Sequence, residues 1–576
     1  MNVSRTRLLV LTIIAGEGLA HPLTVCARDS APARTTDSAT PKVLADSPSQ
    51  SDLPRDDVIM RALVDELGRS MSLQLHDLPR PYFIQLTAED RLTYTVDAAY
   101  GGVLGSDVRR VRTVNSRVRV GSYALDNTNV GRSAGNAGLL PLDDDYLALR
   151  HAIWLVVDED YKRAVEVFAA KLAYMKDKSI EDRPDDYAPA EPVVEAEPKA
   201  DLAFDAGGWQ RKLVRLSARF KDYPRIQDAK VNLFAGTADQ WIVNSEGTRL
   251  RTGDTGILIR IDAETQADDG MPLSDSLQYV GERTEQLPPL ESMLSDIDGM
   301  CQRLMSQTAA IIPEHYTGPV LFEPSAAGRV VESLLAERLG ARPIPLGSGG
   351  WADNSLEKRI GLRIAPRSMS IYDDPSGDLY QNQILAGAYS FDDEAQKPQR
   401  VQLVRGGILK ALVAGRAPTD KIKHSTGHAR RSGFADPQAT IGCLYVTDEN
   451  GIPAEALRKE LIVAAQEEGL DYAVRVEAMK PGGGEALGEP LFAYKVHVAD
   501  GREEPIRGMK FLPVQIRAFK RILAAGDVPA VYNSLSGVAS SFIVPALLFE
   551  ELDLSKTEEE FDKPPILEPP ALRAQN

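Results

Sequence analysis

The sequence predicts an α+β fold, in which helices and strands are partly grouped along the chain. Runs with apolar residues every three or four positions, typical of helices, stand mainly before residue 318, among β-rich runs. From Gly318 onward, short alternating runs broken by Asp, Gly and Pro turns dominate. This partial segregation is typical of the α+β class. The length of 576 residues, 43% of them hydrophobic, predicts more than one domain, each with its own core.

The first predicted domain spans residues 56–317. It begins with a helix, because apolar residues recur at helical spacing at Val58, Met60, Leu63 and Leu67. β-rich runs follow over 81–128, with a Gly-Gly break at 101–102. Further along, alternation predicts a β-meander over 226–266 with a turn at 244–247. Apolar spacing predicts helices over 145–178, 209–223 and 287–311.

The second predicted domain, residues 318–560, is rich in strands and contains one clear later helix over 454–469. Within the first domain, residues 179–201 form an acidic insertion rich in Pro and Ala, a composition that predicts a solvated excursion of the chain. Residues 28–55 are rich in Ser, Pro and Asp, which predicts a disordered linker. Residues 561–576 are expected to form a flexible tail.

Residues 1–27 have the features of a secretory signal peptide. Arg5 and Arg7 precede a short apolar run, and small residues suited to signal peptidase end at Ala20 and Ala27. We therefore expect an exported protein, periplasmic or extracellular. A lipobox-like sequence ends at Cys26, so a lipoprotein anchored there is an alternative. No other apolar run reaches the ~18 residues of a spanning helix, so no integral membrane span is expected in the mature chain.

Charge and cysteine content exclude two further classes. The formal net charge is −17 and Lys and Arg are not clustered, so nucleic acid is not an expected partner. The three cysteines are too few for a disulfide scaffold. We expect Cys301 and Cys443 to be buried as small hydrophobic residues.

Several stretches of the second domain, taken in order, resemble one peptidase family. They are SFDDEAQKPQRVQLVRGGILKALV at 390–413, KIKHSTGHARRSGFADPQATIGCLYV at 421–446, and VASSFIVPALLFEELDLSK at 538–556. With these stretches the chain resembles the TldD/TldE (PmbA) family, most strongly over 318–555. Its front part looks like the long secreted branch of that family.

The resemblance implies a two-domain chain, with an N-terminal mixed α/β region and a C-terminal antiparallel β pseudobarrel that carries a few helices. It also implies that members act in pairs. The TldD-type subunit holds zinc on a His-Glu-x-x-x-His helix with a later Cys, and it cuts unfolded peptides. The TldE-type subunit lacks these ligands and completes the complex.

The helix expected in GPVLFEPSAAGRVVESLLAERLG, residues 318–340, departs from the zinc pattern. Glu332, Ser333 and Glu337 stand at the three motif places. The residues directly before the last strand run, 530–542, contain no cysteine. Places five residues apart converge only if the helix contains a π-bulge. The sequence favours an ordinary amphipathic helix without a metal, because one apolar face forms from Ala327, Val330, Val331, Leu334 and Leu335.

The loop HSTGHARR at 424–431 is the most site-like segment of the sequence. Gly427 permits close backbone approach, and two arginines can fork onto a peptide carboxylate or carbonyls. His424 and His428 are spaced for a metal only on a helix, which Gly427 disfavours. The predicted peptide-binding residues are therefore Ser425, Thr426, Gly427, His428, Arg430 and Arg431.

These features predict a non-catalytic TldE-like subunit of an exported complex that degrades unfolded peptides. Such a subunit would bind no cofactor itself, and zinc would sit in a TldD-type partner. It would pair with that homologue or form a homodimer. Two alternatives stay open: an active metallopeptidase with a non-standard site, and a peptide-binding or assembly scaffold without a peptidase partner.

Overall fold

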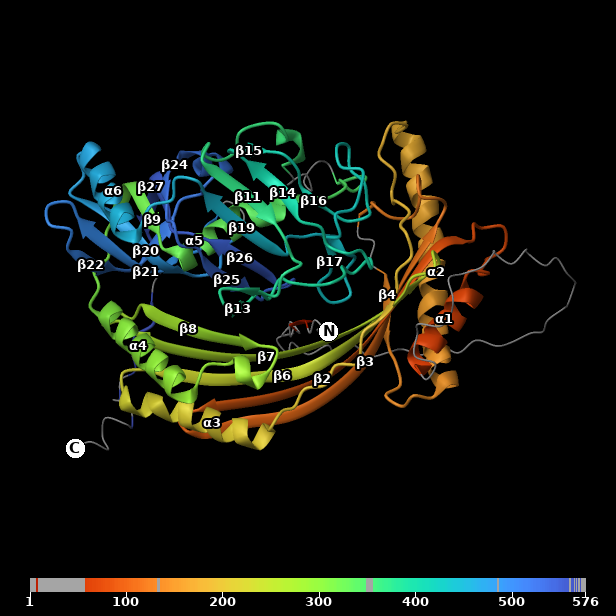
Figure 1. Ribbon diagram of the computed structural model, residues 1–576, viewed down its shortest axis with the longest axis horizontal. Helices are drawn as coiled ribbons and strands as arrows, with labels where there is room; N and C mark the ends of the chain where they lie inside the picture. Colours follow the sequence, from red (N-terminus) through yellow and green to blue (C-terminus); the bar gives the residue numbers. More distant parts are fainter. Residues whose placement is uncertain are drawn as a thin grey trace, which may run out of the picture.

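The computed structural model describes residues 7–8, 57–131, 135–348, 356–483, 486–558, 561–563, 565, 567 and 570. The predicted linker at 28–55, the leader apart from Arg7 and Leu8, and most of the tail at 561–576 lie outside these residues. A long curved sheet carries helices on its outer side, and a strand-rich body lies against its inner side (Figure 1). This arrangement confirms the predicted α+β class.

Four long strands form the body of the N-terminal eight-stranded sheet, and adjacent strands among these four are antiparallel. They are β2 (Pro81–Ala99), β3 (Gly102–Val120), β6 (Asp228–Asn244) and β7 (Arg249–Gln266). Four shorter strands complete the sheet: β1 (Arg7–Leu8), β4 (Asn136–Leu139), β5 (Val194–Ala196) and β8 (Pro272–Gly281). The predicted breaks at 101–102 and 244–247 are the two tight turns between the long strands.

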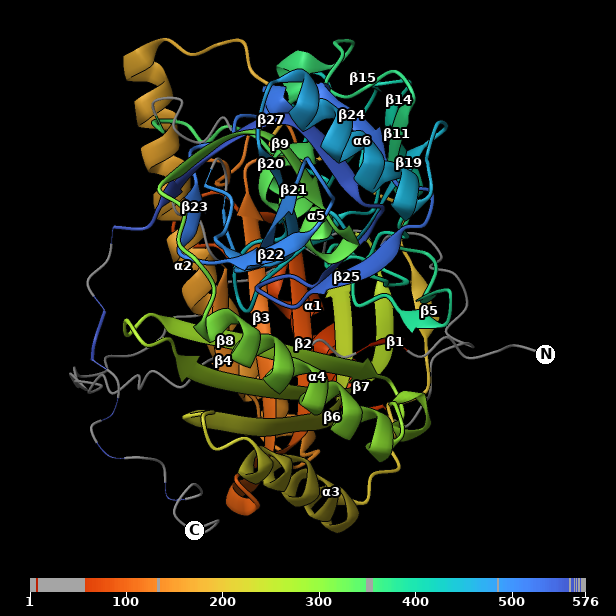
Figure 2. The same cartoon turned by 90° about the vertical axis from the view of Figure 1, so that its left-hand side faces the viewer.

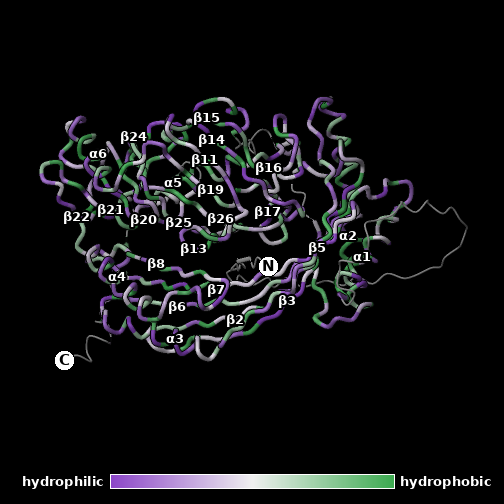
Figure 3. Tube along the Cα trace, viewed as in Figure 1, coloured by the Kyte–Doolittle hydropathy of each residue, from purple (hydrophilic) through white to green (hydrophobic). Residues whose placement is uncertain are grey.

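Helices cover one face of this sheet, as the two views of Figures 1 and 2 show. They are α1 (Val58–Ser70), α2 (Tyr146–Lys178), α3 (Ala206–Ala218) and α4 (Leu290–Thr308). Even-numbered residues of β2, such as Leu86, Ala88 and Val96, are buried beneath them. Side chains alternate between the faces of a strand, so odd-numbered residues of β2 point to the inner face. Hydrophobic and hydrophilic residues are interspersed along the long strands (Figure 3).

The C-terminal body contains a six-stranded and a seven-stranded sheet. The six-stranded sheet comprises β11 (Met369–Asp373), β14 (Val401–Arg405), β15 (Ile408–Leu409), β19 (Cys443–Asp448), β25 (Ala530–Ser534) and β26 (Ser540–Val544). The seven-stranded sheet comprises β9 (His315–Phe322), β20 (Tyr472–Met479), β21 (Pro490–His497), β22 (Glu503–Ile506), β23 (Met509–Phe511), β24 (Ile522–Ala525) and β27 (Leu547–Lys556). Most pairs are antiparallel, as expected, but β9–β20 and β19–β26 are parallel, so both sheets are mixed.

Smaller elements complete this body. Three two-stranded ladders pair β10 (Gly340–Ala341) with β16 (Val413–Ala414), β12 (Leu379–Tyr380) with β13 (Gln383–Ile384), and β17 (Ala429–Arg430) with β18 (Gln438–Ala439). The helices are α5 (Pro324–Val331) and α6 (Ala454–Glu467). The main core lies between the two sheets and α5.

The acidic segment 179–201 is exposed over much of its length, as its composition predicted, but part of it is held against the rest of the protein. Asp186 and Tyr187 are buried, and β5 within the segment pairs in parallel with β7. Asp186 accepts a hydrogen bond at 2.6 Å from Nζ of Lys171, a residue of α2 whose side chain is also fully buried. Ion pairing therefore holds this acidic chain against the N-terminal body.

Two further expectations can be compared with the described residues. Cys301 and Cys443 are free thiols in buried positions, which confirms their predicted packing role. Within the described part of the chain, no helix is both long and apolar enough to cross a membrane.

Candidate functional site

The inner face of the long sheet and the C-terminal body enclose a cleft of about 660 Å³, here called the interdomain cleft. Its sheet wall follows the alternation of the strands. Odd-numbered residues of β2 and β3 point into it, namely Glu89, Arg91, Thr93, Thr95, Asp107, Arg109, Val111 and Thr113. Their even-numbered neighbours point to the opposite face of the sheet, so the strand alternation places the cleft residues on one face.

Two of the predicted peptide-binding residues, Arg430 and Arg431, line the opposite wall of the interdomain cleft. Arg431 is held in place: its backbone N–H and its Nε both donate to Asp393, at 2.9 and 3.2 Å, and its Nη1 donates to the carbonyl of Gly433. The Arg430 guanidinium lies over the ring of Tyr389, with 4.2 Å between Cζ and the ring centroid. The structure therefore brings these two arginines to a cleft, as the loop hypothesis requires.

The first half of the loop does not line that cleft. His428 is buried, and its Nε2 lies 2.8 Å from Oδ2 of Asp373. Its Nδ1 lies 2.8 Å from the carbonyl and 2.9 Å from the hydroxyl of Thr426, so both ring nitrogens have partners within the C-terminal body. His424 is exposed, so the two histidines do not form a metal pair. Thr426 accepts from the backbone N–H of Ala414, which ties the loop to β16.

Gly427 does require a glycine, but for packing within the C-terminal body. Its φ is +72°, and a Cβ there would lie 2.2 Å from the carbonyl oxygen of Lys397. Ser425 donates to the carbonyl of Ala414. Of the six predicted peptide-binding residues, Ser425, Thr426, Gly427 and His428 thus build the loop, and only the two arginines reach the interdomain cleft.

The helix at the zinc-motif place is not an ordinary α-helix throughout, which corrects the sequence-based expectation. α5 ends at Val331 and continues as a π-helical turn over Glu332–Ala336, followed by a 3₁₀ turn over Glu337–Leu339. The predicted apolar face is confirmed, because Ala327, Val330, Val331, Leu334 and Leu335 are all buried. Glu332 and Glu337 therefore flank one π turn, the backbone geometry that brings residues five apart together.

The side chains around this π turn fit zinc poorly. Oε2 of Glu332 lies 3.4 Å from Nη1 of Arg329 and accepts from the Tyr532 hydroxyl at 3.2 Å. Arg329 also stacks on Tyr532, with 4.7 Å between Cζ and the ring centroid. Burial and the neighbouring Glu332 carboxylate raise the pKa of Tyr532, so the phenol keeps its proton and donates. An arginine cation already neutralises this carboxylate, and Ser333 cannot act as a base.

A second cleft of about 990 Å³ opens beside this helix. Arg329, Tyr532 and Ser325 line it on one side, and Arg260, Tyr279 and other residues of β7 and β8 line it on the other. Gly537, in the turn between β25 and β26, lines both this cleft and the interdomain cleft. The π turn and the two loop arginines therefore border neighbouring spaces between the same two bodies.

Sequence reasoning missed four residues of these surfaces: Tyr389, Asp393, Arg329 and Tyr532. Asp393 gave a signal as half of the Asp pair in YSFDDEAQ, but paired Asp residues are usual in turns. Its neighbour Asp392 does behave as a turn residue, since it accepts from the backbone N–H groups of Glu394, Gln396 and Ala429. Arg329 and Tyr532 are some two hundred residues apart, so no local pattern joins them.

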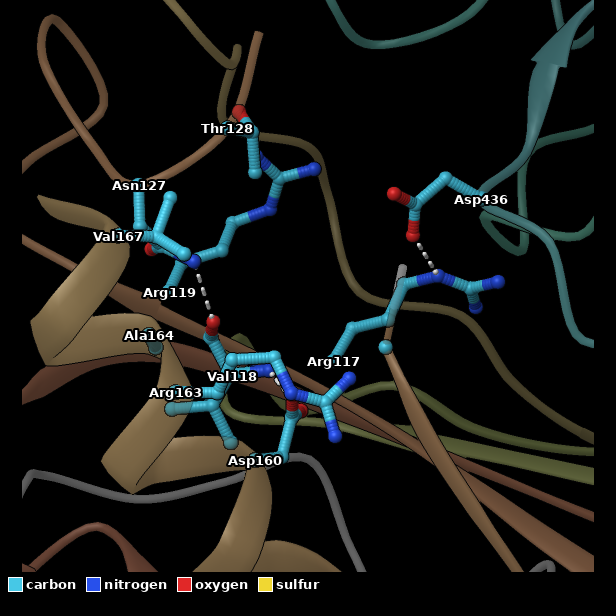
Figure 4. Close-up of a pocket in the computed structure, with 11 residues that line it drawn as sticks. Arg117, Val118, Arg119, Asn127, Thr128, Asp160, Arg163, Ala164, Val167 and Asp436 are labelled. Carbon is cyan, nitrogen blue, oxygen red and sulfur yellow. Dashed lines mark hydrogen bonds and ion pairs between the residues drawn. The ribbon is translucent and has the colours of Figure 1, made fainter. Parts of the chain in front are cut away.

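A small cavity of about 30 Å³ lies where β3, α2 and the loop after β17 meet (Figure 4). Arg117 of β3 reaches across to the C-terminal body, where its Nε lies 3.1 Å from Asp436. Asp160 of α2 accepts from the Ser116 hydroxyl at 2.7 Å and from the Val118 N–H at 2.8 Å. Burial raises the pKa of Asp160 to about 7.

Comparisons with known proteins agree on one family. Residues 315–556 match the family model of the PmbA/TldA metallopeptidase C-terminal domain. A protein of Archaeoglobus fulgidus described as a metalloprotease is 23% identical over 181 residues, 31% of this chain and 40% of that protein. Another metalloprotease, from Methanothermobacter thermautotrophicus, is 23% identical over 310 residues, 52% of this chain and 60% of that protein. The matches thus span roughly half the length of these relatives.

Solved structures share the fold over most of the chain. TldE from Thermococcus kodakarensis superposes with a TM-score of 0.56 at 13% identity and covers 86% of this chain and 100% of its own. A protein of Bacteroides thetaiotaomicron described as a putative modulator of DNA gyrase gives a TM-score of 0.57 at 12% identity, covering 87% and 98%. The family model over residues 315–556 and the metalloprotease relatives support a PmbA/TldD-type C-terminal domain in this chain, and the solved structures show that its fold is shared.

Proposed function

We propose that this chain is the non-catalytic, TldE-like member of a complex that degrades unfolded peptides, and that a TldD-type partner supplies the zinc. The contact of Glu332 with Arg329 and Tyr532 carries the proposal. A metal would have to displace the guanidinium and the phenol from the carboxylate oxygen, and the nearby arginine cation would repel it. The π turn retains the backbone geometry that would bring residues five apart together, while the Glu332 side chain contacts Arg329 and Tyr532 instead of a metal.

In this proposal the chain contributes a peptide-binding surface instead of the chemistry. The interdomain cleft is large enough for several residues of an extended peptide, and its lining mixes charged, threonine and aromatic side chains. The extended segment Arg7–Leu8 pairs with Asp254 and Thr255 of β7, and Asp254 lines the cleft, so this strand edge accepts an extended chain.

Elemental analysis and peptide hydrolysis test this assignment. The isolated protein should hold well under one zinc per chain and leave an unfolded peptide intact, because Arg329 competes for Glu332. Mixed with a TldD-type homologue from the same organism, it should form a complex that binds zinc and cleaves the peptide. Glu332→Ala and Glu337→Ala should leave the activity of the mixture intact. Stoichiometric zinc in the isolated chain, with hydrolysis abolished by either variant, would refute the proposal.

We further propose that the mature chain works outside the cytoplasm, because Arg5 and Arg7 precede an apolar run and a small-residue cleavage site. N-terminal sequencing of the protein from its native host should give a chain that starts after Ala20 or Ala27, or at an acylated Cys26. Cytoplasmic protein that keeps Met1 would contradict this expectation.

A further inference from the structure

We propose that Arg430 anchors a carboxylate of the bound peptide, and that the apolar surface beside it takes the neighbouring side chain. The inference rests on the proposed peptide binding and adds the chemical class of the ligand. It assigns the anchoring role to one arginine of the pair.

Of the two loop arginines, Arg430 is the one with a buried donor that has no acceptor among the described residues. Its Nη1 is buried and has no hydrogen-bond partner among the described residues. Its nearest carboxylate is 3.9 Å away, between Nε and Oδ2 of Asp393, which is too long for a hydrogen bond. The guanidinium is oriented by Tyr389 and its side chain is 17% exposed, so the charge is largely removed from water. A buried cation without an acceptor is unfavourable, and a ligand carboxylate could compensate it at the part of the side chain that is exposed to the cleft.

Arg431 differs in each of these respects. Asp393 accepts from both its backbone and its side chain, and Nη1 donates to Gly433. Its side chain is 7% exposed, and Nη2 lies 3.9 Å from Oε2 of Glu89 across the cleft. Arg431 therefore holds the loop and Asp393 in place. Asp393 forms its hydrogen bonds with Arg431, so it compensates the charge of Arg430 less.

Apolar side chains on both walls line the interdomain cleft together with Arg430. Phe234 and Ala238 of β6 form an apolar pair separate from the large cores. Phe434, four residues after Arg430, is 48% exposed at the same cleft. Val538 and Ala539, which belong to the C-terminal body like Arg430, also line the cleft. This surface fits an apolar side chain, so the geometry favours an apolar residue that carries, or directly precedes, the carboxylate.

Charge differs between the two walls of the cleft. The sheet wall carries Glu89, Asp107 and Asp254 against Arg91 and Arg109, whereas the C-terminal wall carries Arg430 and Arg431 against Asp393 alone. A carboxylate is therefore favoured at the C-terminal wall.

Binding of three labelled peptides tests the inference by fluorescence anisotropy. The probes are rhodamine-Gly-Ser-Gly-Ala-Leu-Phe with a free C-terminal acid, the same peptide as the C-terminal amide, and the amide with Glu in place of Ala. The free acid should bind the purified chain about tenfold or more tightly than the plain amide, since a charge-assisted hydrogen bond to a buried arginine is lost in the amide. In Arg430→Gln the two affinities should become equal.

The matched control is Arg400→Gln. Arg400 also stacks on a tyrosine, at 3.8 Å from Cζ to the ring centroid of Tyr372, but it does not line the cleft. It should preserve the preference for the acid. Arg430→Lys keeps the charge but loses the planar guanidinium, so it should retain part of the preference for the acid. If Arg430→Gln lowers the melting temperature, Arg430→Lys replaces it in the test.

The outcomes separate the inference from the proposed function. If the Glu-containing amide binds as tightly as the free acid, and Arg430→Gln removes that binding, the carboxylate comes from a side chain. Equal binding of acid and amide to the wild-type protein, or an acid preference that survives in Arg430→Gln, overturns the inference and leaves peptide binding standing. Failure of all three probes to bind overturns both.

Discussion

Replacing Asp186 with alanine should lower the free energy of unfolding by about 3–5 kcal/mol, because it strands a buried ammonium. The carboxylate accepts from Lys171 at 2.6 Å, from Asn129 at 2.9 Å and from the backbone N–H of Asp126 at 2.8 Å. Both side chains of the Lys171–Asp186 pair are 0% exposed. Urea unfolding of the wild type and Asp186→Ala measures the effect.

Two companion variants make this result specific. Lys171→Met should be less harmful than Asp186→Ala, because Arg183 still neutralises the carboxylate. Asp177→Ala removes a surface pair with Lys178 whose side chains are 71% and 57% exposed, and it should change stability by less than about 1 kcal/mol. Similar losses for Asp186→Ala and Asp177→Ala would mean that residues 179–201 are not anchored by charge.

A second large effect is expected from pH, through Asp160. Its pKa is raised to about 7 in the folded chain, against about 3.9 in an unfolded one. Between these values the folded state keeps a proton that the unfolded state has released. The free energy of unfolding therefore falls as pH rises from about 4 to about 7, by up to about 4 kcal/mol for this group. Burial is the main cause, and the carboxylate of Asp436 adds to it while Arg163 opposes it.

Asp160→Asn should remove this pH dependence while keeping an oxygen that accepts from Ser116 and Val118. The variant should match the wild type near pH 4 and be more stable than it at pH 8. Unfolding curves of the wild type and the variant at pH 4, 6 and 8 give the comparison. The control is Glu159→Gln, because the side chain of Glu159 is 69% exposed. Glu282 also has a pKa raised to about 7, so the wild type keeps part of its pH slope in either variant. A pH 8 stability no higher in Asp160→Asn would contradict the expected protonation.

Local spacing was sufficient where one residue pattern decides the structure. The buried face of α5 followed from its apolar positions, and the turn at 244–247 followed from its residue types. The acidic segment 179–201 could not be placed in this way, because Lys171 and Arg183 compensate Asp186 only in the folded chain. The composition of a segment indicates how well it is solvated, but it does not indicate which cations pair with its carboxylates in the folded chain.

The candidate site was predicted only in part for the same reason. The sequence indicated Arg430 and Arg431, but their roles differ because Asp393 and Tyr389 approach them unequally. Convergence of Glu332 and Glu337 requires a π turn, but the apolar face alone fits an ordinary helix, so the sequence does not predict this turn. Its contact with Tyr532 joins residues 200 positions apart, beyond any periodicity.

The alternation along β2 and β3 has a consequence for how this protein could diverge. Every second residue over 89–95 and 107–113 lines the interdomain cleft, and the intervening ones point to the helical face. Substitutions at Thr93, Thr95 or Arg109 can alter what the cleft accepts while the supporting layer is untouched. A one-residue insertion would instead exchange the two sets and present Leu86 or Ala88 to the cleft. Ligand preference can therefore drift by point substitution at little risk to folding, whereas length changes in these strands should be rare among functional variants.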